Sequence, residues 1–338
     1  MTRRRYLARR LALLVLVVFG ISIVAFLLVH VLPGDPARSR LGVFATEELV
    51  QLKRAEMGLD KSLPEQYVTY MGNVFRGDLG DSWRTHNPVA EDFVERFPAT
   101  IELALAALLL AVVLGVSLGV AAALRRNGPF DHLATLLGIL GISAPVFWIG
   151  LLLIIAFVTQ LHVLPAPLGR LASDVDAPAQ ITGLYVVDSL LTANWEALRS
   201  SLLYLVLPAV TLGILPLAPI TRMTRAAMIE ALDSDFVRAA RALGLSRTQV
   251  VLKIALRNAL IPVVSMVGLQ LGYLVGGAVL VEIVFTWSGI GLYLYRSVIG
   301  LDFAPIQSLV LIVGVLFALI NLAVDMLYFA IDPRIRVR

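Results

Sequence analysis

Six long apolar segments restrict this chain to a membrane fold. A helix needs about 20 predominantly apolar residues to cross a bilayer, and 59% of the 338 residues are hydrophobic while only 15% are charged. The segments that qualify are Leu11–Leu32, Ala99–Leu124, Leu133–Val158, Leu202–Ile220, Ala259–Phe285 and Ile306–Ile331. We therefore expect an all-α integral membrane protein with six spans. The fourth span should kink, because proline removes a helix hydrogen bond, at Pro208, Pro216 and Pro219.

Basic residues predict which side of the membrane each loop faces. With both termini in the cytosol, 17 of the 28 lysines and arginines lie inside and three lie in the remaining outer loops. Eight more lie in segment 33–98, which is long enough to be translocated regardless of charge. The N-terminal apolar run is longer than the core of a signal peptide and lacks a small-residue cleavage pattern. It is therefore expected to remain as the first span.

Several kinds of site find no support in the sequence. There is no cysteine, the four histidines lie far apart, and no module for reading nucleic acid is apparent. A Walker A loop needs Gly before its Lys, and the one lysine followed by Ser or Thr, Lys61, follows Asp60 instead. We expect no metal or cofactor on this chain, no catalytic role and no nucleic-acid partner. Energy for any transport must come from another chain or an ion gradient.

Two other classes of membrane protein are alternatives to a transporter driven by a partner chain. A membrane-embedded hydrolase would need a nucleophile with its base, or a metal cluster, and no such constellation stands out. An ion-coupled secondary transporter typically shows repeated halves, and the pattern of residues 235–257 has no second copy. The ion-coupled carrier remains the less favoured alternative.

The first external segment, residues 33–98, begins with signals for a short helix. Thr46 can cap a helix whose first turn holds Glu47 and Glu48, and Gly58 is placed to end it. The helix would lie outside the membrane, against the bilayer, the protein itself or a soluble partner. Glu47 and Glu48 are candidate contacts for such a partner.

A second external helix has a capping box made by Ser62 and Glu65 and a stop at Gly77. Its apolar side follows helical spacing through Tyr67, Tyr70, Met71, Val74 and Phe75. This side either packs on the protein's own surface or docks a partner, in which case Tyr67 and Tyr70 are the candidate contacts.

The remaining external sequence is less regular. Residues 87–96 are expected to form an interfacial helix that leads into the second span, and residues 162–200 are expected to form an irregular loop. The chain thus divides into a cytosolic start with the first span (1–32), an external helical segment (33–98) and a core (99–338) that includes the cytosolic loop 221–258.

The cytosolic interruption at residues 235–257 is patterned more strongly than a simple connecting turn. Asp233, Ser234 or Asp235 can cap a short helix, and Gly244 stands where a left-handed residue would end it. The apolar residues of this first helix are expected to share one face: Phe236, Ala239, Ala240 and Leu243.

A second helix should follow at once, because Ser246 and Gln249 form a capping box ahead of Val250, Ile254 and Leu256. Basic residues surround the whole turn, which by itself fits a solvated loop on the cytosolic side. The pattern of helix, sharp glycine turn and helix instead favours a surface that a cytosolic partner grips.

At these residues the chain resembles the membrane subunits of ABC importers. The run Ala239-Ala240-x3-Gly244-x9-Ile254-x-Leu256 is similar to their EAA motif, although Arg238 replaces the motif's Glu and Arg257 stands where the pattern has Pro. The resemblance implies that the first helix is a coupling helix, inserted into a groove on a cytosolic ATPase. Its implied contacts are Asp235, Phe236, Arg238, Ala239, Ala240, Arg241, Leu243 and Gly244.

Further motifs narrow the resemblance to the dipeptide and oligopeptide permease family, of the DppB/OppB type. They extend over nearly the whole chain and include Leu32-Pro-Gly-Asp-Pro36, Gly77-Asp-Leu-Gly-Asp-Ser-Trp83, Arg96-Phe-Pro-Ala-Thr-Ile-Glu-Leu103, Ser143-Ala-Pro-Val-Phe-Trp-Ile-Gly150, Arg257-Asn-Ala-Leu-Ile-Pro262 and Asp332-Pro-Arg-Ile-Arg336. The implied fold is the type I importer permease (MetI-like) fold with six transmembrane helices.

The family also implies a division of labour in a bacterial plasma (inner) membrane. Two related permease subunits would pair with two ATPases, which use ATP and Mg²⁺, and with an extracytoplasmic peptide-binding protein. The cargo would be a dipeptide or oligopeptide, or in sibling systems glutathione, a nickel chelate or an opine. Polar groups inside the spans are candidates for the substrate path or for pairing between helices: Glu102, Gln270, Glu282, Asn321 and Asp325.

Overall fold

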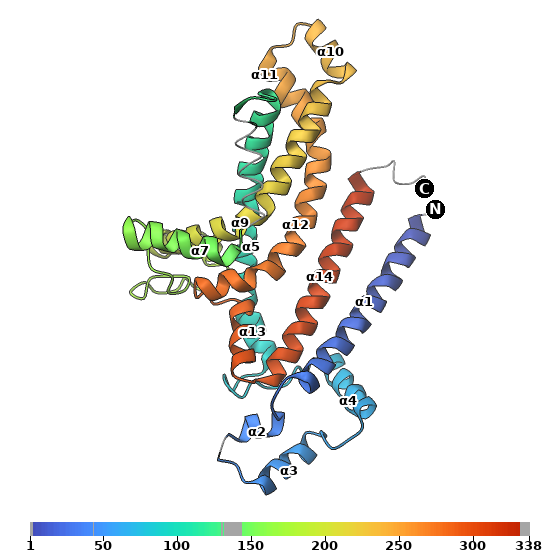
Figure 1. Cartoon of the computed structure of the whole chain (residues 1–338), viewed down its shortest axis with the longest axis vertical. Helices are drawn as coiled ribbons and strands as arrows, with labels where there is room; N and C mark the ends of the chain where they lie inside the picture. Colours follow the sequence, from blue (N-terminus) through green and yellow to red (C-terminus); the bar gives the residue numbers. More distant parts are fainter. Residues whose placement is uncertain (1–2, 43, 130, 132–143, 332–338) are drawn as a thin grey trace. The chain divides into compact units, whose positions relative to one another are not determined.

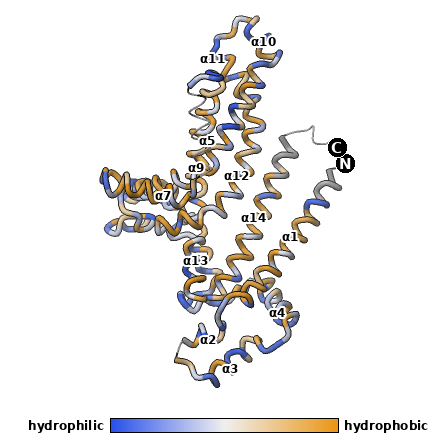
Figure 2. Tube along the Cα trace, viewed as in Figure 1, coloured by the Kyte–Doolittle hydropathy of each residue, from blue (hydrophilic) through white to orange (hydrophobic). Residues whose placement is uncertain are grey.

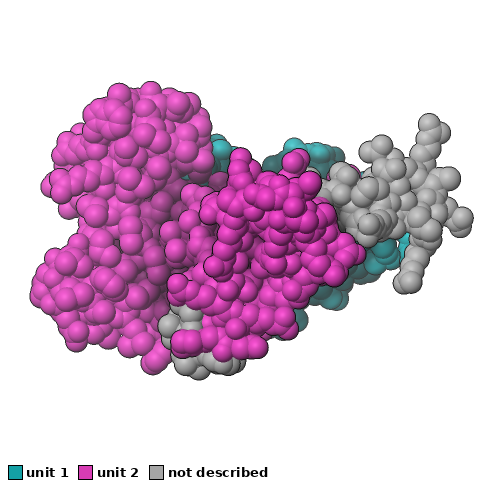
Figure 3. Space-filling model, turned by 90° about the horizontal axis from the view of Figure 1, so that it is seen from above, with its two compact units in different colours: residues 1–98, 288–322, 338 teal, residues 99–287, 323–337 magenta. Residues whose placement is uncertain are grey.

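A computed structural model describes residues 3–42, 44–129, 131 and 144–331 of the chain. All the regular secondary structure of the described residues is helical, apart from a single isolated β-bridge between Asp81 and Pro88. The chain forms two compact units, shown in teal and magenta in Figure 3. The first unit holds residues 1–98 and 288–322, and the second holds residues 99–287 and 323–337.

The first unit contains a long N-terminal helix, three short helices after it, and the segment that leads into the last span. In chain order its helices are α1 (Arg3–Val31), α2 (Pro36–Leu41), α3 (Glu47–Glu56), α4 (Leu63–Phe75), α13 (Ile290–Ile299) and the first part of α14 (Phe303–Ile331). Figure 2 shows hydrophobic colours along α1 and α14 and hydrophilic colours on α3.

Both helices predicted in segment 33–98 are confirmed, together with their end signals. Thr46 caps α3, and Ser62 and Glu65 form the capping box of α4. Gly58 and Gly77 both adopt the left-handed conformation, with φ of +68° and +82°. These signals are local, which explains why the sequence contained them in full.

The second unit contains the long helices that pack into its core. Its elements are α5 (Val89–Leu124, which begins in the first unit), α7 (Val146–Ile154), a π-helical turn (Ile155–Gln160), α8 (Tyr185–Leu191), α9 (Trp195–Leu232), α10 (Asp235–Ala242), α11 (Arg247–Gln249), a second π-helical turn (Val250–Ala255) and α12 (Leu256–Val284). Figure 1 shows α5, α9 and α12 running alongside one another.

Five helices among the described residues are long and apolar enough to cross a membrane. They correspond to the predicted first, second, fourth, fifth and sixth spans. The first part of the predicted third span, residues 133–143, lies outside the described residues, and the rest of it falls on the shorter helical run 146–160. The fourth span, α9, is one helix of 38 residues that continues through all three prolines.

The structure corrects several boundaries. Residues 87–96 do not form a separate interfacial helix, because α5 runs from Val89 through Pro98 into the span without a break. Segment 162–200 is not wholly irregular, since it contains α8 and the start of α9. The helix that begins at Arg247 continues without a break into the fifth span, which was expected to begin only at Ala259, while α2 and α13 were not expected at all.

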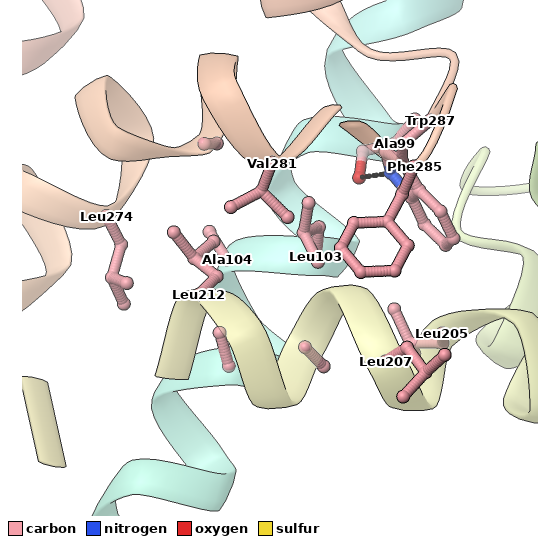
Figure 4. Close-up of a cluster of buried hydrophobic side chains, with 13 residues drawn as sticks. Ala99, Leu103, Ala104, Leu205, Leu207, Leu212, Leu274, Val281, Phe285 and Trp287 are labelled. Atoms are coloured by element: carbon pink, nitrogen blue, oxygen red, sulfur yellow. Dashed lines mark hydrogen bonds between the residues drawn. The ribbon is translucent and has the colours of Figure 1, made fainter. Parts of the chain in front are cut away.

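The core of the second unit is built by α5, α9 and α12. Leu103, Leu212, Val281, Phe285 and Trp287 interdigitate there, and the Trp287 indole Nε1–H donates to the Ala99 carbonyl oxygen at 2.8 Å (Figure 4). Lipid tails are as apolar as these side chains, so close packing rather than removal from water must hold spans together.

Two glycines on α5 permit that close packing. A Cβ atom at Gly115 would lie 2.8 Å from the Ile220 side chain, and one at Gly119 would lie 2.6 Å from the Thr224 side chain. Because the two glycines are four residues apart, they form one small-residue stripe that α9 contacts.

Candidate functional site

The turn between α9 and α12 is a rigid, capped structure. Gly244 has φ of +80°, its N–H donates to the Arg241 carbonyl at 3.0 Å, and the Leu245 N–H donates to the Ala240 carbonyl at 3.3 Å. This pair of bonds is the Schellman motif, which closes the C-terminal end of α10. The expected sequence of helix, glycine turn and capped second start is therefore confirmed.

The next helix begins with the predicted capping box. The Gln249 side-chain oxygen accepts from the Ser246 N–H at 3.0 Å, and the Gln249 N–H donates to the Ser246 hydroxyl at 3.4 Å. Both ends of the turn thus have their backbone donors and acceptors engaged. The end of α10 and the start of α11 are therefore both closed by hydrogen bonds within the turn.

Helix α10 has a buried side and an exposed side, and the division differs from the expected one. Val237 and Ala240 are buried in a cluster with residues of α5, α9 and α12, whereas Phe236, Ala239 and Leu243 are exposed. The exposed fractions are 45% for Phe236 and 81% for Leu243. Because α10 packs against α9 and α12, the side of α10 that carries the smaller residues Val237 and Ala240 is the buried one. The expectation that Phe236, Ala239, Ala240 and Leu243 share one face was therefore wrong for Ala240, which is buried.

Charged groups ring this exposed tip. Arg238 forms an ion pair with Asp235 on the same helix, and Arg126 lies 3.7 Å from Asp233. Arg241 and Arg247 line a hollow of about 510 Å³ together with apolar residues that include Leu124, Leu232 and Leu245. Pairs as exposed as these contribute little stability. The arrangement is thus an apolar knob among charged side chains of both signs, suited to contact with another protein.

A buried ion pair joins the second span to the loop that precedes α8. The Arg170 guanidinium Nη2 donates to the Glu102 carboxylate at 2.7 Å and to the Gly183 carbonyl at 2.9 Å. Glu102 also accepts from the Val186 N–H at 2.8 Å, and the guanidinium lies 3.5 Å from the centre of the Tyr185 ring. Glu102 was a candidate either for the substrate path or for pairing between helices. The geometry supports pairing between elements of the protein.

The other polar residues predicted inside the spans do not gather into one site. Glu282 is fully buried on α12 and accepts a bond from the Thr100 hydroxyl at 2.6 Å. The Gln270 amide lies 3.6 Å from the Met266 sulfur. Asn321 is half-buried on α14, and the side chain of Asp325 lies outside the description. A role for these groups in the substrate path remains a prediction.

The four external candidates lie in two environments. Glu47 is paired with Arg38, and Glu48 is exposed beside it on α3. Tyr67 and Tyr70 face α1 instead: their rings pack on Phe26 at 5.4 and 6.0 Å between centroids. The two tyrosines hold the protein's own helices together, and the contact of any of the four with a partner remains a prediction.

Sequence reasoning missed two buried networks in the first unit. Asp92 accepts bonds from Thr85, Tyr293 and Arg96 at 2.5, 2.8 and 3.1 Å. Burial, followed by the bond to Asp92, raises the pKa of Tyr293. The second network joins Asp302 to the Ser82 hydroxyl at 2.5 Å. The sequence holds no signal that links Asp92 to Tyr293 or Asp302 to Ser82, which lie some 200 residues apart. From sequence, Asp92 and Asp302 could have been singled out only as acidic residues.

Comparison with known proteins places the chain in a family. Residues 115–337 match the family described as "Binding-protein-dependent transport system inner membrane component", and residues 3–104 match the N-terminal part of such a membrane component. Together these matches cover nearly the whole chain.

Characterised relatives align over almost their full length. The chain is 45% identical to the probable D,D-dipeptide transport system permease protein DdpB of Escherichia coli, over 95% of this chain and 94% of the relative. It is 43% identical to the di/tripeptide transport system permease protein DppB of Pseudomonas aeruginosa, over 98% of each. It is 40% identical to the glutathione transport system permease protein GsiC of E. coli, over 98% of this chain and 99% of the relative.

These matches agree with the all-helical fold and with its five long apolar helices. The family's members are non-catalytic membrane components that work with other subunits, and their fold is the MetI-like fold of type I importer permeases. This chain belongs to the family of binding-protein-dependent transport system inner membrane components, as a multi-pass permease subunit of the DppB type.

Proposed function

We propose that this chain carries dipeptides or short oligopeptides across the membrane as one of two permease subunits of an ATP-driven importer. The observation that carries the proposal is the exposed apolar tip of α10, formed by Phe236 and Leu243 on a rigid turn that continues into a span. A fixed apolar knob that water surrounds is costly unless a partner covers it. The similarity to dipeptide permeases supports the choice of cargo.

The partner at this knob is a cytosolic ATPase, and two copies of it would serve the two permease subunits. ATP and Mg²⁺ act at those ATPases, and this chain binds no cofactor of its own. The predicted contacts remain Asp235, Phe236, Arg238, Ala239, Ala240, Arg241, Leu243 and Gly244, with Ala240 and Gly244 shaping the helix rather than reaching outward. Closure of the ATPases would move α10, and the turn would pass that movement to α12.

Both termini lie in the cytoplasm in this proposal. The excess of basic residues around α10 and at the two chain ends supports that orientation. Helices α2, α3 and α4 then lie outside, where a peptide-binding protein delivers cargo. Glu47 and Glu48 of α3 are the proposed acidic contacts, while Tyr67 and Tyr70 would act by holding α4 in place.

Between these two ends, substrate would pass beside the half-buried polar residues of the spans. Gln270 and Asn321 are the better candidates for direct contact, since Glu102 and Glu282 are occupied by partners within the protein. Asp325 lies one helical turn beyond Asn321 and is proposed with it.

Purification of the chain from its native host in mild detergent tests the proposal. Mass spectrometry should recover a second, homologous permease subunit and Walker-motif ATPases, and dipeptides with the cognate binding protein should raise ATP hydrolysis after reconstitution. A chain that purifies alone and transports in response to an ion gradient would overturn the proposal.

A second cargo is glutathione, favoured by the 40% identity to a glutathione permease. Glutathione is itself a tripeptide with two carboxylates, so one importer type can suit either cargo. In the same assay, stimulation by glutathione without stimulation by dipeptides would select it.

A further inference from the structure

Helix α4 presents three different surfaces besides its ends. One surface contacts α1: the Tyr67 hydroxyl lies 2.7 Å from the Ser22 hydroxyl, and both tyrosines pack on Phe26. A second surface, with Gln66 and Asn73, lines a cavity of about 370 Å³ within the first unit. These two surfaces fix how α4 is rotated about its own axis.

The third surface is apolar and uncovered. Val68 is 70% exposed and Phe75 is 84% exposed. Seven residues make nearly two full turns, so these two side chains point the same way, within about 20°. The polar residues Thr69 and Arg76 are also exposed but point about 100° away from them. The exposed part of α4 is therefore itself amphipathic.

Contacts with α1 show how deep α4 lies. Ser22 and Phe26 precede the last residue of α1, Val31, by nine and five residues. At 1.5 Å per residue, the contacts fall about 13 and 8 Å inside the end of that helix. Residues 9–31 of α1 form an apolar candidate span. A helix that contacts a span at these positions lies at the depth where headgroups give way to acyl chains.

The surface of α1 around these contacts is also apolar and uncovered. Phe19, Val24 and Leu27 are 57%, 60% and 42% exposed. Side chains of this kind on a spanning helix face lipid or another span. The uncovered flank of α4 is thus continuous in depth with the uncovered face of a span.

Both ends of α4 suit a water-poor environment. Its first backbone donors are engaged by the Ser62 and Glu65 capping box, and Gly77 closes its last turn through the bonds Gly77 N–H to Val74 O and Asp78 N–H to Asn73 O. Backbone N–H and C=O groups that lack a hydrogen bond are energetically costly near hydrocarbon. Closed helix ends are therefore required there, whereas in water they only add stability.

We propose that α4 is an interfacial helix whose flank, Val68 and Phe75, lies in the acyl chains of the leaflet at the C-terminal end of α1. Its occupant is membrane lipid, and the polar side with Arg76 faces the aqueous boundary. The inference requires only that α1 crosses the membrane and does not depend on the nature of the cargo.

Site-directed spin labelling tests this directly, because the chain has no cysteine to remove. Single variants Val68→Cys and Phe75→Cys would be labelled in the assembled importer, reconstituted in phosphatidylethanolamine and phosphatidylglycerol bilayers. Arg76→Cys is the matched control, because Arg76 is adjacent to Phe75, exposed on the polar side and not among the residues that line the cavity. Collision with oxygen, which concentrates in lipid, is compared with collision with a water-soluble nickel chelate.

The proposal predicts that the ratio of oxygen to nickel collisions is several-fold higher at residues 68 and 75 than at residue 76. Equal ratios at all three positions would overturn it and show a flank in water. Labels at 68 and 75 that neither reagent reaches would also overturn it, because a protein partner or a second copy would then cover the flank.

Discussion

The guanidinium of Arg170 lies 2.7 Å from the carboxylate of Glu102, and neither side chain is more than 7% exposed. This pair attaches the loop before α8 to the second span. Removing one member of a buried pair leaves the other charge unpaired, which typically costs about 3–5 kcal/mol. Removing both costs much less, because no isolated charge remains.

Arg170→Gln should therefore lower the thermal midpoint of the purified protein strongly, and Glu102→Gln with Arg170→Gln should recover part of the loss. Arg199→Gln is the control, since Arg199 is exposed on α9 near the same loop. Thermal unfolding in detergent measures all four proteins. A double variant no more stable than Arg170→Gln would show that the pair does not couple the two elements.

Substitution of Gly244 should act through the backbone alone. No atom lies within 4 Å of the position a Cβ would take, yet φ is +80°. L-residues in the left-handed region cost about 1–2 kcal/mol, and Asn costs less. Coupled ATP hydrolysis should thus fall in the order Gly, Asn, Ala, Val. Gly20→Ala on α1, which is equally unobstructed but helical, should leave the rate unchanged. An unchanged rate of coupled ATP hydrolysis in Gly244→Val would show that coupling does not require this turn geometry.

Asp188 should make the loop before α8 sensitive to acid. Burial alone would raise its pKa, but bonds from the Thr182 hydroxyl and from the N–H groups of residues 181–183 outweigh it and lower the pKa. A carboxylate with a depressed pKa stabilises the fold above its unfolded pKa, near 3.9, and this contribution is lost as pH falls through the folded value.

Asp188→Asn should consequently destabilise the loop at pH 7, by roughly 1–3 kcal/mol, and should abolish its further loosening below pH 4. Hydrogen exchange of the amides at 181–183, corrected for intrinsic rate and read by mass spectrometry, measures both effects. Wild-type protection that is the same at pH 7 and pH 3 would contradict this assignment.

The glycine stripe on α5 predicts a packing defect. A Cβ at Gly119 would lie 2.8 Å from the Thr221 carbonyl oxygen as well as 2.6 Å from Thr224, so α9 must shift. Gly119→Ala should cost about 1–3 kcal/mol. Gly276→Ala on α12 is the matched control, because nothing lies within 4 Å of its Cβ position. Equal thermal midpoints for the two variants would show that α5 and α9 are not packed this closely.

Local chemistry made much of the fold readable from sequence. The capping boxes at Ser62 and Ser246 and the glycine ends at Gly58, Gly77 and Gly244 all lie where their neighbours predict, because each involves residues at most five apart. The existence of the spans could also be predicted from the sequence, because the thickness of the bilayer fixes the length of the apolar run.

The remainder depends on contacts between distant residues. Arg170 is an ordinary basic loop residue until Glu102, 68 residues earlier, is placed beside it. The outward side of α10 could not be chosen from Phe236 and Leu243 alone, because packing of the small residues Val237 and Ala240 decides it. Short helices such as α13 lack the length for a clear period and are held by networks such as that of Tyr293 and Asp92.

The most direct test of the central claim measures whether the tip of α10 holds the ATPase. Phe236→Ser with Leu243→Ser removes two exposed apolar side chains, while Leu191→Ser on α8, 62% exposed, removes one on the opposite side of the membrane in the proposed orientation. The account predicts an unchanged thermal midpoint for the chain in both, with ATPase co-purification reduced about tenfold or more only in the α10 variant. Undiminished ATPase recovery and coupled hydrolysis in the α10 variant would contradict the account.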